Sequence, residues 1–471
     1  MSGAVTLPPY PEYQSVDETW FDRIPVHWKA TALRGVLNQR NEKNNPIKTT
    51  QILSLSIAHG VTLYSDRGRG GNKRKGDLSA YKIAHEGDIV LNSMNVIVGA
   101  VGLSRYTGAI SPVYYALYPN TIEASITYYD KVFSNPVFQR YLMIYGRGIL
   151  IKKSDSGKFN TIRMKISPND LKGTLLPLPP RTEQEQIVAY MRAQDAHIAR
   201  FIKAKRDLIK LLTEQKLRII DHAVTRGVDA TVTLKASGIE WLGEVPEHWE
   251  VVHIGSAVQI INGYPFDSGL FDAVVGHPLV RIRDLNRTHT EVQFNGPEVL
   301  EAVINTGDLI VGMDGDFNAA RWRGGRALLN QRMCCLRPRK QITTEYLALV
   351  IPKALKFIND LTLSTTVKHL SSGDVKRLRF PIPGESEQLQ IVAHVENETA
   401  PINNAIARTE EEIKLIREYR DRLIADVVTG QLDVRGWQPG PDDVVDDAAL
   451  AVLGDDQEDV TGEEDGDGEE N

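Results

Sequence analysis

The stretch that decides the fold runs from Glu183 to His222 and reads EQEQIVAYMRAQDAHIARFIKAKRDLIKLLTEQKLRIIDH. It contains neither proline nor glycine, and its apolar residues recur at steps built from three and four, which indicates one apolar face of a helix. At 1.5 Å per residue such a helix would be about 60 Å long, longer than most helices of globular proteins. A helix of this length with an apolar face needs a partner.

The sequence contains a second copy of this stretch 204 residues later. Residues 387–430 read EQLQIVAHVENETAPINNAIARTEEEIKLIREYRDRLIADVVTG, without a gap relative to the first copy. Pro401 inside the second copy predicts a kink or a later helix start. We expect the two apolar faces to pair through Ile187, Met191, Ile198, Ile202, Ile209, Leu212, Ile219, Ile391, Val395, Ile402, Ile406, Ile413, Ile416 and Leu423.

The repeat extends beyond the helices. The stretch WFDRIPVHW, residues 20–28, returns as WLGEVPEHW, residues 241–249, and the chain reads as lobe, helix, lobe, helix. This organisation predicts an α+β protein with two tandem α/β lobes separated by two long α-helices, which form an antiparallel coiled-coil pair with a pseudo-twofold. The predicted segments are 1–180 and 231–383 for the lobes, 181–230 and 384–435 for the helices, and 436–471 for an acidic disordered tail.

Each lobe is predicted to consist of short strands followed by a helix. In the first lobe the strands are expected at 51–57, 81–84, 88–92 and 113–118, with a helix at 125–145. In the second lobe they are expected at 251–261, 279–283, 308–311 and 332–336, with a helix at 344–361. His27 and His248 each stand beside tryptophan and proline, which favours a packed docking corner over chemistry.

Composition narrows the functional class. The net charge is −6, but residues 442–471 carry fourteen acidic residues and no Lys or Arg, so the rest of the chain is basic by about +8. The neighbouring Cys334 and Cys335 cannot form a structural disulfide or a zinc site, and we expect a reducing, cytoplasmic location and no bound metal. A basic body with an acidic tail favours a nucleic-acid-binding protein.

Polar and basic residues in the predicted loops are the candidates for contacts with DNA. Taken singly, each loop could equally be a solvated surface turn. The aspartates at 314 and 316 resemble a metal pair, but nearby arginines favour salt bridges or base contacts. The candidate DNA-binding residues are Arg67, Arg69, Lys73, Arg74, Lys75, Asn92, Asn95, Lys152, Lys153, Lys158, Arg281, Arg283, Arg287, His289, Asn318, Arg321, Arg323, Arg326, Lys368 and His369.

Several ordered motifs resemble the specificity subunit of type I restriction–modification systems. They are GDIVLNSM at 87–94, SPVY at 111–114, GDLIVGMDGD at 307–316, and the Pro-rich turns that lead to Glu183-Gln184 and to Glu387-Gln388. In that family two target-recognition domains alternate with two helical conserved regions. The resemblance implies double-stranded DNA, methyltransferase subunits and restriction–translocase subunits as partners. No membrane is expected, because no apolar run approaches the ~20 residues that a membrane span needs.

The same resemblance implies that this chain is not itself an enzyme. It contains no Asn/Asp-Pro-Pro-Tyr/Phe motif for methyl transfer, no Gly-x-x-x-x-Gly-Lys-Ser/Thr loop for ATP and no convincing nuclease cluster. S-adenosylmethionine, ATP and Mg²⁺ would then belong to partner subunits, with no cofactor bound here. Two alternatives stay open: the recognition part of another DNA methyltransferase or restriction enzyme, and a non-catalytic coiled-coil scaffold.

Overall fold

The computed structural model divides the chain into two compact units, each with one lobe and part of both long helices. Unit 1 comprises Met1–Asp207 and Thr409–Asn471, and unit 2 comprises Leu208–Arg408. The structure describes residues 7–57, 59–66, 76–94, 99–149, 152–153, 159–160, 163–315, 317–339, 341–361, 370–445, 450 and 453. Over these residues, every helix is too short or too polar to cross a membrane.

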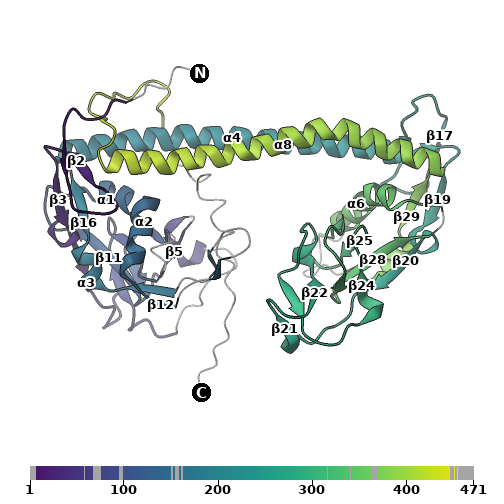
Figure 1. Ribbon diagram of the computed structural model, residues 1–471, viewed down its shortest axis with the longest axis horizontal. Coiled ribbons are helices and arrows are strands. Elements are labelled where there is room, and N and C mark those ends of the chain that lie inside the picture. The colour runs from purple at the N-terminus through teal and green to yellow at the C-terminus, as the bar shows by residue number, and fades with distance from the viewer. Residues whose placement is uncertain are drawn as a thin grey trace. The chain divides into compact units, whose positions relative to one another are not determined.

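The two long helices lie side by side and run antiparallel (Figure 1). Their bounds are α4 Arg181–Arg226 and α8 Glu385–Val428. In unit 1, Arg420 Nε donates to Asp195 Oδ1 at 2.7 Å. In unit 2, Lys216 Nζ donates to Asn403 Oδ1 at 2.8 Å. As the residue number rises along α4 it falls along α8, which confirms the predicted antiparallel helix pair.

Every residue of the predicted apolar face is buried or half-buried. The burial is deepest near the lobes, where Ile187, Met191 and Ile391 are fully covered, and it is only partial at Ile209 and Leu212. The later helix start predicted at Pro401 is wrong, because α8 begins at Glu385 and continues through this exposed proline.

Lobe 1 is built on a four-stranded antiparallel sheet in the order β4-β11-β8-β9. The strands are β4 Leu37–Arg40, β11 Tyr114–Pro119, β8 Ile89–Asn92 and β9 Val101–Leu103. On one face, Ile89 and Leu91 join the main core with α1, while on the other Val90 packs with β5 and β6. Because β8 is covered on both faces, its sequence is a continuous apolar run.

The remaining elements of lobe 1 surround this sheet. The helices are α1 Ile126–Phe133, α2 Pro136–Tyr141 and α3 Pro168–Gly173. The paired strands are β1 Tyr13–Ser15 with β2 Arg23–Pro25, β3 Lys29–Ala32 with β16 Leu175–Leu178, β5 Leu53–Ser56 with β6 Gly60–Leu63, β7 Lys82–Ala84 with β10 Gly108–Ile110, β12 Gly146–Ile149 with β15 Arg163–Ile166, and β13 Lys152–Lys153 with β14 Phe159–Asn160.

Lobe 2 repeats the same sheet and adds a second one. The first has the order β20 Val258–Asn262, β28 Met333–Pro338, β25 Leu309–Gly312 and β26 Ala319–Arg321. The second has the order β21 Phe271–Asp272, β23 Val292–Phe294, β22 His277–Val280, β27 Ala327–Leu329 and β24 Val303–Ile304. The other elements are β17 Leu234–Ala236, β18 Glu244–Pro246, β19 Glu250–His253, β29 Arg379–Ile382, α5 Ile254–Ala257, α6 Thr344–Leu361 and α7 Ser372–Arg377.

Three predicted elements of the lobes need correction. The helix expected at 125–145 is broken into α1, α2 and a 3₁₀ turn, because Pro136 lacks an N–H and the Asn135 side chain accepts from Val137 N at 2.8 Å to start a new helix. The strand expected at 251–261 is interrupted by α5, whose Ile254 N donates to Leu378 O at 2.7 Å. The strand expected at 279–283 ends at Val280, and a 3₁₀ turn follows at Ile282–Asp284.

The first part of the predicted disordered tail is packed against α4 in unit 1. The Trp437 ring meets the Tyr190 ring edge to face at 5.4 Å, and Asp443 accepts from His197 at 2.6 Å. Arg200 donates to the carbonyl of Asp442 at 2.7 Å. The expected disorder is therefore wrong for this part, while 446–449 and most later positions lie outside the described residues.

Candidate nucleic-acid interface

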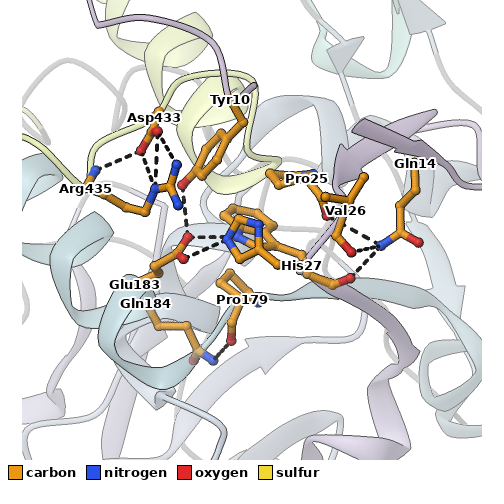
Figure 2. Close-up of polar contacts among 11 residues, drawn as sticks. Tyr10, Gln14, Pro25, Val26, His27, Pro179, Glu183, Gln184, Asp433 and Arg435 are labelled. Atoms are coloured by element: carbon orange, nitrogen blue, oxygen red, sulfur yellow. Dashed lines mark hydrogen bonds and ion pairs between the residues drawn. The ribbon is translucent and has the colours of Figure 1, made fainter. Parts of the chain in front are cut away.

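A buried carboxylate fixes lobe 1 to the first turn of α4 (Figure 2). Glu183 accepts three hydrogen bonds, from His27 Nε2 at 2.7 Å, Trp28 Nε1 at 2.9 Å and Tyr10 Oη at 3.1 Å. Burial first, and then the negative charge of Glu183, raise the pKa of Tyr10 far above its usual value, so this hydroxyl stays a donor. His27 is thus a structural anchor in a docking corner, as its sequence context indicates.

Glu183 and Glu387 are each followed by a glutamine, Gln184 or Gln388. The side chain of each glutamine joins a lobe to the start of a long helix through hydrogen bonds. Gln184 Nε2 donates to the carbonyls of Pro179 and Glu123, both at 2.8 Å, and its Oε1 accepts from Ser125 N at 2.7 Å. In unit 2 the buried Gln388 makes the matching set, which comprises Pro383 O at 2.9 Å, Gln341 O at 2.7 Å and Thr343 N at 2.9 Å. The repeated Glu-Gln motif therefore sets how each lobe is held on its helix.

Each corner also receives the end of the other long helix. In unit 2, His248 Nε2 lies 2.9 Å from Glu387 at the start of α8, and Gly227, just after α4, faces Trp249. In unit 1, Gly430, just after α8, faces Trp28 in the same way. Both glycines have positive φ, 75° and 72°, which a residue with a Cβ rarely adopts. The two lobes are thus mounted by the same local architecture.

The structure describes only a few of the candidate DNA-binding residues of lobe 1. Asn92 is half-buried at the end of β8, where its Oδ1 accepts from Met94 N at 3.0 Å. Lys152 and Lys153 form β13. The candidates Arg67, Arg69, Lys73, Arg74, Lys75, Asn95 and Lys158, and in lobe 2 Lys368 and His369, lie outside the described residues.

In lobe 2, the arginines before and after Trp322 differ in their partners. Arg321 lies 3.0 Å from Glu345 of α6, and Arg326 makes a two-bond pair with Glu298 at 2.9 and 3.1 Å. Arg323 is exposed and makes no ion pair with any residue that the structure describes. Asn318 and His289 are exposed as well. A contact of any of these residues with DNA stays a prediction.

Three further candidates are brought together around one carboxylate. Arg281, Arg283 and Arg287 all approach Glu291, which precedes β23. The hydrogen bond from Arg287 is the main cause that holds the pKa of Glu291 below its usual value. The sequence indicated the arginines but not Glu291, because a carboxylate carries no local signal of the side chains that it will meet in the fold. The closely spaced arginines just before Glu291 were the only feature of the sequence that pointed to a nearby carboxylate partner.

Comparison with known proteins shows what this chain is similar to. Residues 246–415 match the family described as the Type I restriction modification DNA specificity domain. The chain is 34% identical over 196 residues to the type I restriction enzyme EcoBI specificity subunit of Escherichia coli, with 41% of each chain covered. It is 25% identical over 279 residues to the putative type I restriction enzyme MjaX specificity subunit of Methanocaldococcus jannaschii, with 57% of this chain and 62% of the relative covered.

Both alignments span less than two thirds of the relative's length. A solved structure from work on complex assembly and conformational transition of the type I R-M system has the same fold, with a TM-score of 0.56, 16% sequence identity, and coverage of 87% of this chain and 99% of that chain. These matches confirm the resemblance that the ordered sequence motifs indicate.

Proposed function

We propose that this chain, whose residues 246–415 match the family described as the Type I restriction modification DNA specificity domain, selects the DNA target of a type I complex. Each lobe would read one block of a bipartite, asymmetric sequence in double-stranded DNA. The helix pair would set the unread spacer between the blocks, with half-site centres about one DNA turn apart. The observation that carries this proposal is the duplicated mounting, in which Gln184 and Gln388 hold two lobes with the same sheet order on antiparallel helices.

The same proposal divides the work of the complex between this chain, which recognises DNA, and partner subunits, which perform the chemistry. The outer faces of α4 and α8 are rich in Gln, Glu, Lys and Arg, and we assign them to docking of the methyltransferase subunits. Methyl transfer, translocation and cleavage would then be performed by partner subunits, which would bind S-adenosylmethionine, ATP and Mg²⁺. The chain itself would act in the cytoplasm as a non-catalytic reader.

Exchanging one lobe tests this function. The chain is co-expressed with the methyltransferase subunits of its source genome, and adenine methylation is mapped by sequencing. Replacing residues 29–176 with the matching lobe of a relative should change one block of the methylated motif and keep the other block and the spacer. A control exchange between chains with the same target should leave the motif unchanged.

The rival functions give different results. A change of both blocks together would contradict independent reading by the lobes. Methylation that does not depend on the lobe would favour the coiled-coil scaffold. Transfer of a radiolabelled methyl group to DNA by the purified chain alone would favour an enzyme.

A further inference from the structure

Lobe 2 contains a turn that brings three arginines to one place. Strand β22 ends at Val280, and the backbone N–H of Arg281 donates to Asp284 Oδ2 at 3.0 Å. Asp284 is fully buried, and its own N–H donates to Arg281 O at 2.8 Å. Two hydrogen bonds between Arg281 and Asp284 therefore hold the 3₁₀ turn Ile282–Asp284 in place. In Figure 1, β21 and β22 lie at the end of lobe 2 away from the long helices, while β19 and β29 lie next to them.

The arginine side chains meet at the carboxylate of Glu291. Arg287 Nη1 donates a hydrogen bond to Glu291 Oε1. Arg281 Nη2 lies 3.4 Å from Oε2, and Arg283 Nη1 lies 3.7 Å from the same oxygen. The Glu291 side chain is 41% exposed, so the meeting point is open to solvent.

Glu291 does not satisfy the donors that surround it. Each guanidinium carries five N–H groups, whereas a carboxylate offers two oxygens. The 3.7 Å separation from Arg283 is too long for a hydrogen bond, and Arg281 Nε is buried with no hydrogen-bond partner in the described structure. Burial first, and then the neighbouring charge of Arg283, lower the pKa of Arg281. Three arginines against Asp284 and Glu291 leave a positive charge and unused donors.

We infer that Arg281, Arg283 and Arg287 form a phosphate-binding site for the DNA backbone, with Glu291 as an internal counter-ion. Without DNA, Glu291 holds the guanidinium groups together and limits their attraction for any duplex. A backbone phosphate offers more acceptor oxygens than Glu291 in the same place and matches the fork of a guanidinium. This inference rests on the proposed function and adds a residue that restrains non-specific binding.

The test uses the full chain assembled with its methyltransferase subunits. Fluorescent duplexes with the mapped target and with an unrelated sequence are titrated at several NaCl concentrations. Arg283→Ala and Arg287→Ala are the main variants, because Arg281 is largely buried and its loss could disturb folding. Arg377→Ala is the matched control, an exposed arginine of the same unit that pairs with Asp374. Thermal denaturation midpoints verify that each variant is folded.

Both arginine variants should bind the two duplexes several-fold more weakly, and the slope of log affinity against log salt should become shallower by about 0.9 for each phosphate that the variant no longer binds. Glu291→Gln, which keeps the side-chain shape, should bind the unrelated duplex several-fold more tightly and so reduce discrimination. Arg377→Ala should match the wild type.

Three outcomes would overturn the inference. Wild-type affinity and slope in both arginine variants would make the cluster a structural salt bridge. Weaker binding of the target alone would assign the arginines to base edges. Unchanged or weaker binding by Glu291→Gln would remove the counter-ion role. Failure of the wild-type complex to bind any duplex would instead overturn the proposed function, so the two failures are distinguishable.

Discussion

Asp195 of α4 and Arg420 of α8 are joined by a 2.7 Å hydrogen bond across 225 residues of sequence. The other oxygen of Asp195 accepts from Lys131 of α1 at 2.9 Å. One carboxylate, nearly completely buried, therefore ties together the two long helices and lobe 1.

Removing the negative charge of Asp195 should lower the free energy of unfolding of unit 1. Asp195→Asn keeps the size of the side chain but leaves Lys131 and Arg420 without their counter-charge, and we expect a loss of about 3–5 kcal/mol in the free energy of unfolding. Urea denaturation measures it. Glu185→Gln, an exposed member of a pair with Arg181, should cost less than about 1 kcal/mol. Equal effects of the two substitutions would contradict the assigned role of Asp195.

The same residue gives a pH prediction. Burial alone would raise the pKa of Asp195, but Lys131 and Arg420 outweigh burial and hold the pKa below its usual value. A carboxyl with a lowered folded-state pKa stabilises the fold above its unfolded-state pKa of about 3.9 and loses that stabilisation as the pH falls through the folded-state pKa. The difference in unfolding free energy between wild type and Asp195→Asn should therefore shrink as the pH falls below about 4. A difference that stays constant would rule out this linkage.

Loss of the Gln388 side chain should lower the stability of unit 2 far more than loss of its neighbour Gln390. Gln388→Ala leaves Thr343 N without its acceptor and two carbonyls without a donor, at a cost of about 1–3 kcal/mol for each buried group left unsatisfied. Gln390 is exposed on the same helix, and Gln390→Ala should be almost neutral. The hydrogen-exchange rate of the Thr343 backbone amide reports the local effect. Unchanged protection of this amide in Gln388→Ala would contradict the assigned role of Gln388.

The apolar face of α8 predicts a sharp contrast between two positions. Ile413 is 8% exposed and Leu415 is 54% exposed. Ile413→Asp places a charge in the helix pair, and we expect unfolding or aggregation, visible by circular dichroism and gel filtration. Leu415→Asp should fold normally. A soluble, normally assembled Ile413→Asp subunit would be incompatible with pairing through this face.

The basic loop of lobe 1 is predicted from the sequence alone. Replacing Lys73, Arg74 and Lys75 with Ala should weaken binding to all duplexes about equally and flatten the salt dependence. If Arg67 or Arg69 instead contacts a guanine, its loss should cost about 1–3 kcal/mol and relax the target at one position. Titration of matched and single-mismatch duplexes separates the two effects, and no change in any variant would leave the loop a solvated turn.

The sequence predicted the large-scale architecture because the repeat is long and the apolar periodicity is strong. The helix pair and the duplicated lobes follow from the copies at 183–222 and 387–430. Short elements were harder, because their ends depend on tertiary contacts. The turn at Ile254 depends on a bond to Leu378, more than 100 residues away. The break at Asn135 is different, because Pro136 and the Asn135 side-chain cap are local signals that the apolar pattern of 125–145 outweighed.

The candidate site was predicted only in part for a related physical reason. Arginine-rich loops are visible in the sequence, but the carboxylates that occupy those arginines depend on folding. Arg321 and Arg326 pair with Glu345 and Glu298, whereas Arg323 makes no ion pair with the described residues. The docking corner of His27 was predicted without its partner, because a histidine beside tryptophan does not reveal the glutamate, Glu183, that it meets 156 residues later.

The corner of unit 1 imposes an order of events on protein synthesis. Asp433 N donates to Pro8 O at 2.8 Å, and Tyr128 Oη donates to Val428 O at 2.8 Å, so lobe 1 is completed by the end of α8 and the segment that follows it. Unit 2 is one continuous segment, Leu208–Arg408, and all of its residues are translated before the closing piece of unit 1, which begins at Thr409. The lobe that is made first is therefore the one that is finished last, and until then the nascent chain must keep an uncovered apolar surface in solution.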